Sequence, residues 1–192
     1  MTLFIDKSVK VDSCIPKNEI DLISPLINYY GQEICSVLEI GCKKNVNGIY
    51  KTDFENLKIN HVSIDPTGKH GSLSYDLETP VWESLGKFDM VTNIGTTEHF
   101  DNQKTVWENI HNCLNIGGVL VSITPHVGDF SGHGIWYPMT EFYEDFASKN
   151  GYQIEKLYVT GKEPRRLLNV RMHKKENLPF TFPDEKFLKK QM

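Results

Sequence analysis

Apolar and polar positions alternate along the chain in a way that predicts short buried strands separated by amphipathic segments. Apolar runs that end at glycine, proline or polar turn residues are typical of strands in the core of a sheet. Five such runs lie at 36–41, 61–65, 72–77, 87–95 and 117–125. Two further strands, at 152–160 and 165–173, lie close enough in sequence to form a hairpin.

Helical spacing of apolar residues marks three other segments. The first, residues 18–31, contains Pro25 and is followed by a stop at Gly31. The second, 102–114, places Val106, Ile110 and Leu114 on one face, with Asn115 and Gly117 as the stop signals. The third, 139–151, has Thr140 as the expected N-cap and Gly151 as the C-terminal stop.

Strands that alternate with helices predict an α/β fold with a mostly parallel sheet and right-handed crossovers. The chain of 192 residues fits one domain, and we find no repeat or low-complexity linker. We expect a helical lead-in at 1–35, a core at 36–173 and a C-terminal tail at 174–192. The lysines of that tail, Lys174 first among them, are interpreted as a solvated cluster.

Composition narrows the class of protein. An apolar content of 39% and a charged content of 24% are ordinary for a globular protein, and the net charge of −4 argues against a nucleic-acid partner. We expect no membrane span and no secretory signal. The four cysteines include no C-x-x-C pair, which favours a reducing cytoplasm over a zinc or disulfide framework.

Ligands of such sheets bind outside the carboxyl ends of the strands, so the residues at those ends are the candidates for chemistry. Glu39, Gly41 and Cys42 end the first strand, where a glycine lets the backbone approach a ligand closely. Asp65, followed by Pro66, ends the second, where an acid can accept hydrogen bonds from ribose hydroxyls or cap an Asp-Pro turn.

The next two strand ends add further candidates. Asp76 and Leu77 can hold an adenine through a carboxylate and a backbone amide, or simply form a turn. The fourth strand ends at Asn93 and Ile94 and leads to Glu98 and His99, an acid–base pair. After the fifth strand come two more histidines, which are the further candidates for a general base: His126 and His133.

The loop 125–140 is rich in glycine and aromatic residues, which is typical of a lid over a substrate or of a surface loop packed on the core. The spacing of His126, Asp129 and His133 can suit a metal ion, but no further ligand is evident in the sequence, so we expect no metal.

Taken in order, the segments VLEIGC, HVSID, SYDLETP, FDMVTNIGTTEHF and LNIGGVLVSITP resemble the class I S-adenosylmethionine-dependent methyltransferases, and the last two resemble the type-11 pattern. The resemblance implies a Rossmann-like, seven-stranded sheet with helices on both faces and the last strand inserted antiparallel. It implies the residue roles as well: Glu39, Gly41 and Cys42 along the methionine part of the cofactor, Asp65 and Pro66 at the ribose, Asp76 and Leu77 at the adenine, and Asn93 and Ile94 beneath the sulfonium.

The chain departs from that family's pattern in two places. Lys43 and Asn45 stand where the family usually has glycines, and Asn45, Asn47 or Gly48 can supply the turn. The second departure is the span from Asp65 to Asp76, which is too short for the usual helix between the second and third strands.

The resemblance and the residues together predict a methyltransferase that uses S-adenosylmethionine and releases S-adenosylhomocysteine. The absence of an Asn/Asp-Pro-Pro-Tyr/Phe segment after the fourth strand favours a small-molecule or glycan-like acceptor, and the histidines favour methylation of oxygen by in-line displacement. Two alternatives stay open: a catalytically degenerate binding protein of the same fold, and an NAD-dependent oxidoreductase, against which the missing G-x-G-x-x-G speaks.

Overall fold

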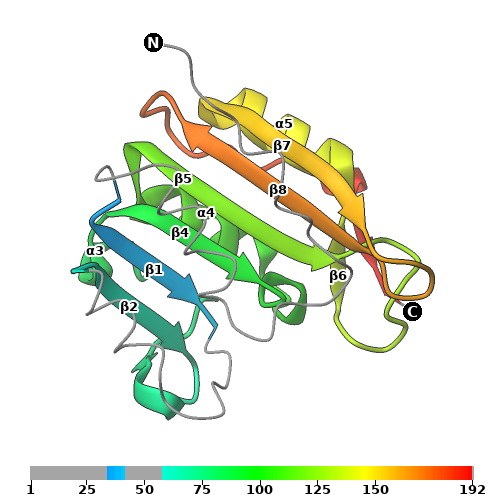
Figure 1. Cartoon of the computed structure of the whole chain (residues 1–192), viewed down its shortest axis with the longest axis horizontal. Coiled ribbons are helices and arrows are strands. Elements are labelled where there is room, and N and C mark those ends of the chain that lie inside the picture. The colour runs from blue at the N-terminus through cyan, green and yellow to red at the C-terminus, as the bar shows by residue number, and fades with distance from the viewer. Residues whose placement is uncertain (1–33, 42–57, 192) are drawn as a thin grey trace.

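The computed structural model describes residues 34–41 and 58–191, and its centre is a seven-stranded sheet (Figure 1). The strand order is β3-β2-β1-β4-β5-β8-β7. The seven strands are β1 (Ser36–Ile40), β2 (Asn60–Asp65), β3 (Leu73–Ser74), β4 (Phe88–Ile94), β5 (Leu114–Pro125), β7 (Tyr152–Thr160) and β8 (Leu167–Lys174).

Strands β1 to β5 are parallel to one another, whereas β8 runs antiparallel between β5 and β7. The predicted fold class is confirmed, including the hairpin of the last two strands and the antiparallel insertion. The third strand is shorter than predicted. Only Leu73 and Ser74 pair with β2, because the chain turns away at Asp76, whose carbonyl accepts the Thr79 N–H at 3.1 Å.

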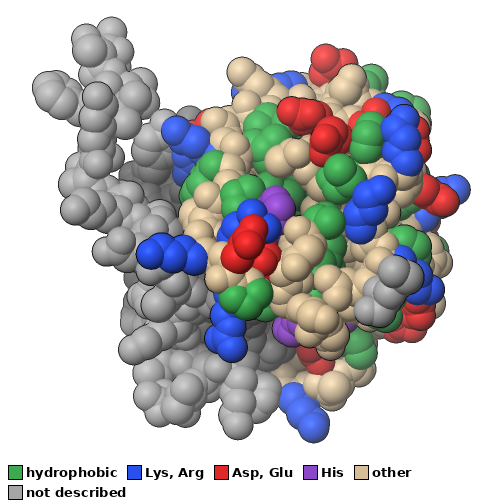
Figure 2. All heavy atoms as spheres, turned by 90° about the vertical axis from the view of Figure 1, so that its right-hand side faces the viewer, with side chains coloured by type: hydrophobic (Ala, Val, Ile, Leu, Met, Phe, Trp, Pro, Cys, Tyr) green, Lys and Arg blue, Asp and Glu red, His purple; other side chains and the backbone are tan. Residues whose placement is uncertain are grey.

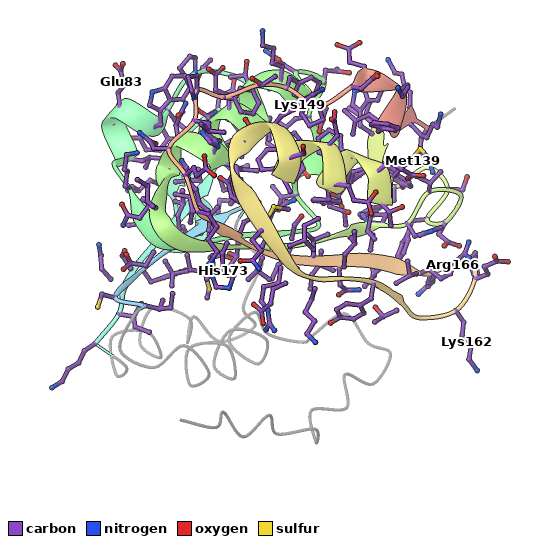
Figure 3. All side chains as sticks on the ribbon, turned by 90° about the horizontal axis from the view of Figure 1, so that it is seen from above. Glu83, Met139, Lys149, Lys162, Arg166 and His173 are labelled. Carbon is purple, nitrogen blue, oxygen red and sulfur yellow. The ribbon has the colours of Figure 1, made fainter. Side chains whose placement is uncertain are left out.

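Helices α4 (Gln103–Cys113) and α5 (Thr140–Asn150) lie over one face of the sheet, and the short α3 (Trp82–Leu85) lies beside them (Figure 3). Three very short 3-10 helices occur in the connections: η2 (Lys69–Gly71), η3 (Thr97–His99) and η4 (Glu185–Phe187). The predicted helix at 18–31 lies outside the described residues. No described helix is long and apolar enough to cross a membrane.

The core between this face and its helices is built around Trp107, which is fully buried. Its ring lies 5.0 Å from Phe142, 5.6 Å from Tyr143 and 5.3 Å from Phe146, all on α5. The predicted apolar face of the second helix, with Val106 and Ile110, is buried against the same core. Aromatic side chains dominate such a core because each removes a large apolar area from water.

The helix ends differ from the prediction in detail. Asn102 caps α4 by accepting the Thr105 N–H at 3.2 Å, but the helix ends at Cys113 and β5 follows directly, without the stop expected at Asn115 and Gly117. The N-cap of α5 is Met139 rather than Thr140, whose hydroxyl donates to the carboxylate of Glu141 instead. Gly151 ends α5 in the left-handed conformation, as predicted.

The C-terminal residues pack against the domain. Strand β9 (Leu188–Lys190) pairs antiparallel with β6 (Trp136–Pro138) in a second, two-stranded sheet that the sequence analysis did not predict. The interpretation of Lys174 as part of a solvated cluster is wrong. Its ammonium group is fully buried and donates to the carbonyls of His111 (2.7 Å) and Leu114 (3.3 Å), where the carbonyls at the end of α4 need partners.

The buried histidine of α4 makes stability depend on pH. Nε2 of His111 donates to the Leu178 carbonyl (2.9 Å), and Nδ1 accepts from the Tyr152 hydroxyl (3.3 Å). Burial, followed by the nearby Lys174 ammonium, lowers the pKa of His111 to about 4. The unfolded chain, with a histidine pKa of about 6.5, therefore binds a proton between these values that the folded chain does not.

We predict that the free energy of unfolding falls by about 3 kcal/mol through His111 as the pH drops from about 6.5 to about 4. Urea denaturation across this range measures the fall. The His111→Gln variant should lose that part of the pH dependence, and a constant change in its stability at neutral pH does not affect this comparison. An equal pH dependence in both proteins would contradict the prediction.

Candidate functional site

The ends of β1, β2 and β4 lie side by side because these parallel strands are neighbours in register. Ile40 is paired with Ile64 on one side and with Asn93 on the other. Glu39, Asp65 and Asn93 are thus brought to the same edge of the sheet, as expected for strand ends that share a ligand. Figure 2 looks onto the side toward which the parallel strands of Figure 1 run, where histidine side chains reach a surface of mixed charge.

Gly41 turns the chain sharply at the end of β1. Its φ of 80° is a left-handed conformation, and its N–H donates to the Ile64 carbonyl at 2.8 Å. A Cβ at this position would lie 2.3 Å from Oγ1 of Thr96, in the loop after β4. The glycine therefore lets the β1 turn and the β4 loop touch, as the sequence predicted for a close backbone approach.

Glu39 lies beneath this turn with a partner that the sequence analysis missed. Its carboxylate Oε2 is 3.3 Å from Nε2 of His61, and both side chains are almost fully buried. In the sequence this pair is indicated only by the period of two along a strand. His61 lies on the same face of β2 as Ser63, and Ser63 is the register partner of Glu39. Cys42, Lys43, Asn45, Asn47 and Gly48 lie outside the described residues.

Asp65 forms the Asp-Pro turn that the sequence offered as one of two roles. Its Oδ1 accepts the Thr67 N–H at 2.8 Å and the Thr67 hydroxyl, and Pro66 between them is exposed. A carboxylate offers about four lone-pair positions on two oxygens, so a turn of this kind is compatible with further acceptance from a ribose. The binding of ribose by Asp65 and Pro66 stays a prediction.

The turn at Asp76 and Leu77 is fixed from α4 by a side chain that the sequence analysis did not single out. Asn109 is buried and donates to the carbonyls of Leu77 (2.9 Å) and Thr79 (2.8 Å), while its Oδ1 accepts the Val81 N–H (2.9 Å). The carboxylate of Asp76 is exposed and accepts the N–H of Glu78. One amide thereby holds the whole turn that is predicted to contact the adenine.

Asn93 has a structural role that can be read directly from its contacts. The side chain is fully buried and donates to the hydroxyls of Thr97 and Ser122, both at 2.9 Å, while its Oδ1 accepts the Thr97 N–H at 3.1 Å. Ser122 in turn is 2.8 Å from the hydroxyl of Tyr143. Buried polar groups need such partners, and this set fixes the direction of the loop after β4. Ile94, the next residue, is buried as well.

Glu98 lies between two imidazoles at the end of that loop. Oε1 is 4.0 Å from Nε2 of His99 and 3.6 Å from Nε2 of His133. The carboxylate is fully buried, whereas the two histidine side chains are 44% and 49% exposed. Burial and the neighbouring His133 lower the pKa of His99, so its imidazole is neutral at neutral pH. The structure thus brings together three of the four predicted catalytic residues.

The fourth candidate, His126, belongs to a neighbouring group of charges. Its Nδ1 is 3.6 Å from Oδ2 of the buried Asp129, and the same oxygen accepts from Nε of Arg166 at 2.7 Å. The metal ligands weighed in the sequence analysis were His126, Asp129 and His133. Among the described residues, the three potential ligands that lie together are instead Glu98, His99 and His133.

Backbone bonds hold the loop of His133 against Glu98. The Ile135 N–H donates to the Glu98 carbonyl at 2.7 Å, and a Cβ at Gly134 would lie 2.8 Å from Cγ of Glu98. Gln191, next to β9, adds bonds from its N–H to the Ile135 carbonyl (2.8 Å) and from its side chain to the Asp129 carbonyl (3.2 Å). The C-terminal residues therefore position this part of the site.

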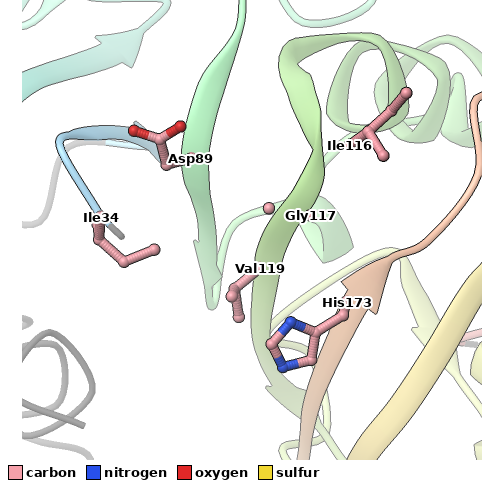
Figure 4. Close-up of a pocket in the computed structure, with 7 residues that line it drawn as sticks. Ile34, Asp89, Ile116, Gly117, Val119 and His173 are labelled. Carbon is pink, nitrogen blue, oxygen red and sulfur yellow. The ribbon is translucent and has the colours of Figure 1, made fainter. Parts of the chain in front are cut away.

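Two cavities among the described residues lie at the opposite edge of the sheet. One of them, of about 210 Å³, lies between the starts of β1, β4 and β5 and the end of β8, and its lining includes Ile34, Asp89, Val119 and His173 (Figure 4). His173 and Arg166 mark the two opposite ends of β8 in Figure 3. This cavity is remote from the predicted catalytic residues.

No model of a known protein family matches the sequence, and no curated protein does. Solved structures do match. The N-methyltransferase NodS from Bradyrhizobium japonicum WM9 has 15% identity and a TM-score of 0.61, over 86% of this chain and 99% of that one. The 1,6-didemethyltoxoflavin-N1-methyltransferase from Burkholderia thailandensis, with bound 1,6-didemethyltoxoflavin and S-adenosylhomocysteine, has 14% identity and a TM-score of 0.60, over 88% and 82%.

A third structure, magnesium protoporphyrin IX methyltransferase from Synechocystis PCC 6803 with bound S-adenosylmethionine, has 11% identity and a TM-score of 0.59, over 83% of this chain and 80% of that one. The strand order, the antiparallel β8 and these likenesses all indicate the same fold. The chain has the fold of the class I S-adenosylmethionine-dependent methyltransferases.

We predict that Gly41→Ala destabilises the domain more than Gly117→Ala does. Both glycines have left-handed φ values, 80° and 83°, but a Cβ at Gly117 meets nothing within 4 Å. The control carries only the conformational cost of about 1–2 kcal/mol. The clash with Thr96 should add about 1–3 kcal/mol for Gly41→Ala. Urea denaturation compares the two, and equal losses would show that Thr96 moves aside freely.

Proposed function

We propose that this chain is a methyltransferase that binds S-adenosylmethionine at the carboxyl ends of β1, β2 and β4 and releases S-adenosylhomocysteine. The observation that carries the proposal is the convergence of the Gly41 turn, the Asp65 turn and the Asn93 loop at one edge of this sheet. The close approach of Gly41 to Thr96 fits a ligand that needs bare backbone beside it, and Asp65 fits a partner with two hydroxyls.

The geometry disfavours the oxidoreductase alternative. Dinucleotide-binding sheets of the Rossmann type have six parallel strands in the order 3-2-1-4-5-6. Here β8 is inserted antiparallel between β5 and β7, which is a different topology at the far side of the sheet. The sequence that follows Gly41 also lacks the G-x-G-x-x-G pattern of dinucleotide-binding proteins.

We assign the residues in the roles for which they were predicted. Asp65 and Pro66 hold the ribose, and Asp76 and Leu77 hold the adenine on the turn fixed by Asn109. We assign Glu39, Gly41 and Cys42 to the methionine part of the cofactor, and Asn93 and Ile94 to the region beneath its sulfonium. When bound, the cofactor supplies a methyl group that its own charge activates. The protein then needs mainly to align the acceptor and to free its lone pair.

The acceptor is proposed to be a hydroxyl of a small molecule or a glycan-like compound. An oxygen nucleophile must lose its proton, and the side chains that can assist are the cluster of Glu98, His99 and His133, with His126 in the adjacent group. The net charge of −4 argues against a nucleic-acid partner. The methyltransferases of similar fold are named for different acceptors, so their names do not identify the acceptor of this chain. The proposal of a hydroxyl acceptor therefore depends on the cluster of Glu98, His99 and His133. A cytoplasmic location stays a prediction from the cysteine pattern.

Calorimetric titration with S-adenosylhomocysteine tests the cofactor site. We predict that Asp65→Ala weakens binding about 10- to 150-fold, since charge-assisted hydrogen bonds of about 1.5–3 kcal/mol are lost. The control Thr67→Val keeps the carboxylate and removes only the hydroxyl that donates to Oδ1, so its affinity should stay within a few-fold. An unchanged affinity in Asp65→Ala would mean that the ribose lies elsewhere. No binding by the unaltered protein would favour a degenerate binding protein.

Transfer of a labelled methyl group to a panel of hydroxyl and amine acceptors tests the reaction. We predict methylation of hydroxyls, and a loss of about 10²- to 10⁴-fold in Glu98→Gln with little change in affinity for S-adenosylhomocysteine. His126→Gln, in the adjacent group, should lose less. Methylation of amines alone would contradict the proposed acceptor, and full activity in Glu98→Gln would remove the cluster from the mechanism.

A further inference from the structure

Glu98, His99 and His133 form a group with the composition of a metal site. One ligand atom from each lies within 4.8 Å of the other two. The imidazole rings of His99 and His133 meet edge to face, with centroids 4.8 Å apart and an interplanar angle of 71°. Both rings are about half exposed, whereas the carboxylate below them is fully buried, so the group opens toward solvent on one side.

We propose that these three side chains bind one divalent transition-metal ion of the zinc class. Two imidazoles and one carboxylate are donors that zinc takes in catalytic sites, where three protein ligands leave a fourth position open for water or substrate. A carboxylate buried at the base of the group supplies the negative charge that the ion needs. The half-exposed histidines leave the open position on the side facing solvent.

The distances require only a small closure. Ligand bonds of about 2.1 Å in tetrahedral geometry place neighbouring ligand atoms about 3.4 Å apart. Oε1 of Glu98 is already 3.6 Å from Nε2 of His133 and 4.0 Å from Nε2 of His99. Rotation of two half-exposed imidazoles is sufficient to close the remaining gaps, because the buried carboxylate can stay where it is.

The backbone around the group is fixed independently of the side chains. Phe130 has a φ of 50°, a left-handed conformation that is uncommon outside glycine. Its carbonyl accepts both the Tyr137 hydroxyl (2.7 Å) and the His133 N–H (3.0 Å). Strain of this kind is found mainly where a loop must present a side chain at a required place. Here the loop presents His133 to Glu98.

The chemical role of the metal site rests on the proposed function, because the ion would act on the acceptor of the methyl group. An acceptor hydroxyl bound at the open position would become more acidic, because the ion stabilises the oxyanion. The O–H bond would break and the proton would pass to solvent water. The oxygen lone pair would then form the bond to the methyl carbon as the carbon–sulfur bond of the cofactor breaks, leaving the neutral thioether. With the ion bound, the imidazoles would be ligands rather than proton acceptors.

Zinc binding tests the proposal without any turnover. The untagged protein is dialysed against Zn²⁺ and its bound metal is measured, and Co²⁺ is added separately to record the visible absorption of a histidine-ligated site. We expect one ion per chain. His99→Ala and His133→Ala should each lower the affinity at least about 100-fold, since even indirect contacts to a metal ligand are worth about 10- to 100-fold. His126→Ala, just outside the group, is the matched control and should bind as the unaltered protein does.

Equal zinc binding by His133→Ala and the unaltered protein would overturn the proposal, as would no stoichiometric binding by the unaltered protein. Circular dichroism of each variant shows whether it is folded, and the exposed positions of His99 and His133 favour that it is. Titration with S-adenosylhomocysteine is carried out on the same samples. Zinc without cofactor binding would leave the site standing and remove the proposed function, whereas cofactor without zinc binding would remove the site alone.

Discussion

The buried amide of Asn93 is the contact on which the geometry of the site depends. It links the end of β4 to Thr97 in the following loop and to Ser122 on β5. With the loop turned back in this way, Thr96 meets Gly41 at the end of β1. The same turn directs Glu98 inward, where it is buried beneath two histidines. One satisfied polar network in the core thus sets both the edge proposed for the cofactor and the cluster of Glu98, His99 and His133.

A second constraint comes from the C-terminal residues. Strand β9 pairs with β6, and Gln191 holds the backbone at Ile135 and Asp129. Because the segment between β5 and β6 carries His133, these bonds limit where that imidazole can move. The residues near this end therefore have structural roles. Lys174 stabilises the end of α4, and β9 fixes a loop of the site.

The sequence predicts the sheet well because its strands are short apolar runs with clear stops. The Gly-Gly start of the β5 core and the Phe-Asp start of β4 are typical examples. It also predicts which residues stand at the strand ends, and so Glu98 and His99. It does not predict that His133, more than thirty positions further along, returns to the same carboxylate, because that contact depends on loop conformation.

Contacts of buried polar side chains with distant backbone groups are not predicted from the sequence for the same reason. Asn109 lies three residues after Val106, at the border of the buried stripe of α4, where it satisfies three backbone groups of the turn after β3. Lys174 is the last residue of β8, and the pattern along the strand does not decide whether its side chain is buried or exposed. Its burial is explained by the position of α4 above it. Polar residues inside the core are specified by partners that lie far away in sequence.

The carboxylates at the two edges of the sheet have different kinds of partner. Asp89, at the amino edge, accepts from the backbone N–H groups of Cys35 and Ser36, from the Ser36 hydroxyl and from Asn115. Burial alone raises the pKa of Asp89, but these fixed donors outweigh it and hold that pKa below its usual range. These donors belong to the starts of β1 and β5, so Asp89 joins both strands to the start of β4.

Glu98, at the carboxyl edge, has the imidazoles of His99 and His133 as neighbours. An imidazole can release a proton, take one up or bind a metal ion, and it does so at neutral pH. A ligand that binds these imidazoles can therefore change their interaction with the buried carboxylate. This difference in the kind of partner supports the carboxyl edge as the proposed place for chemistry, whereas the carboxylate at the amino edge anchors the strands.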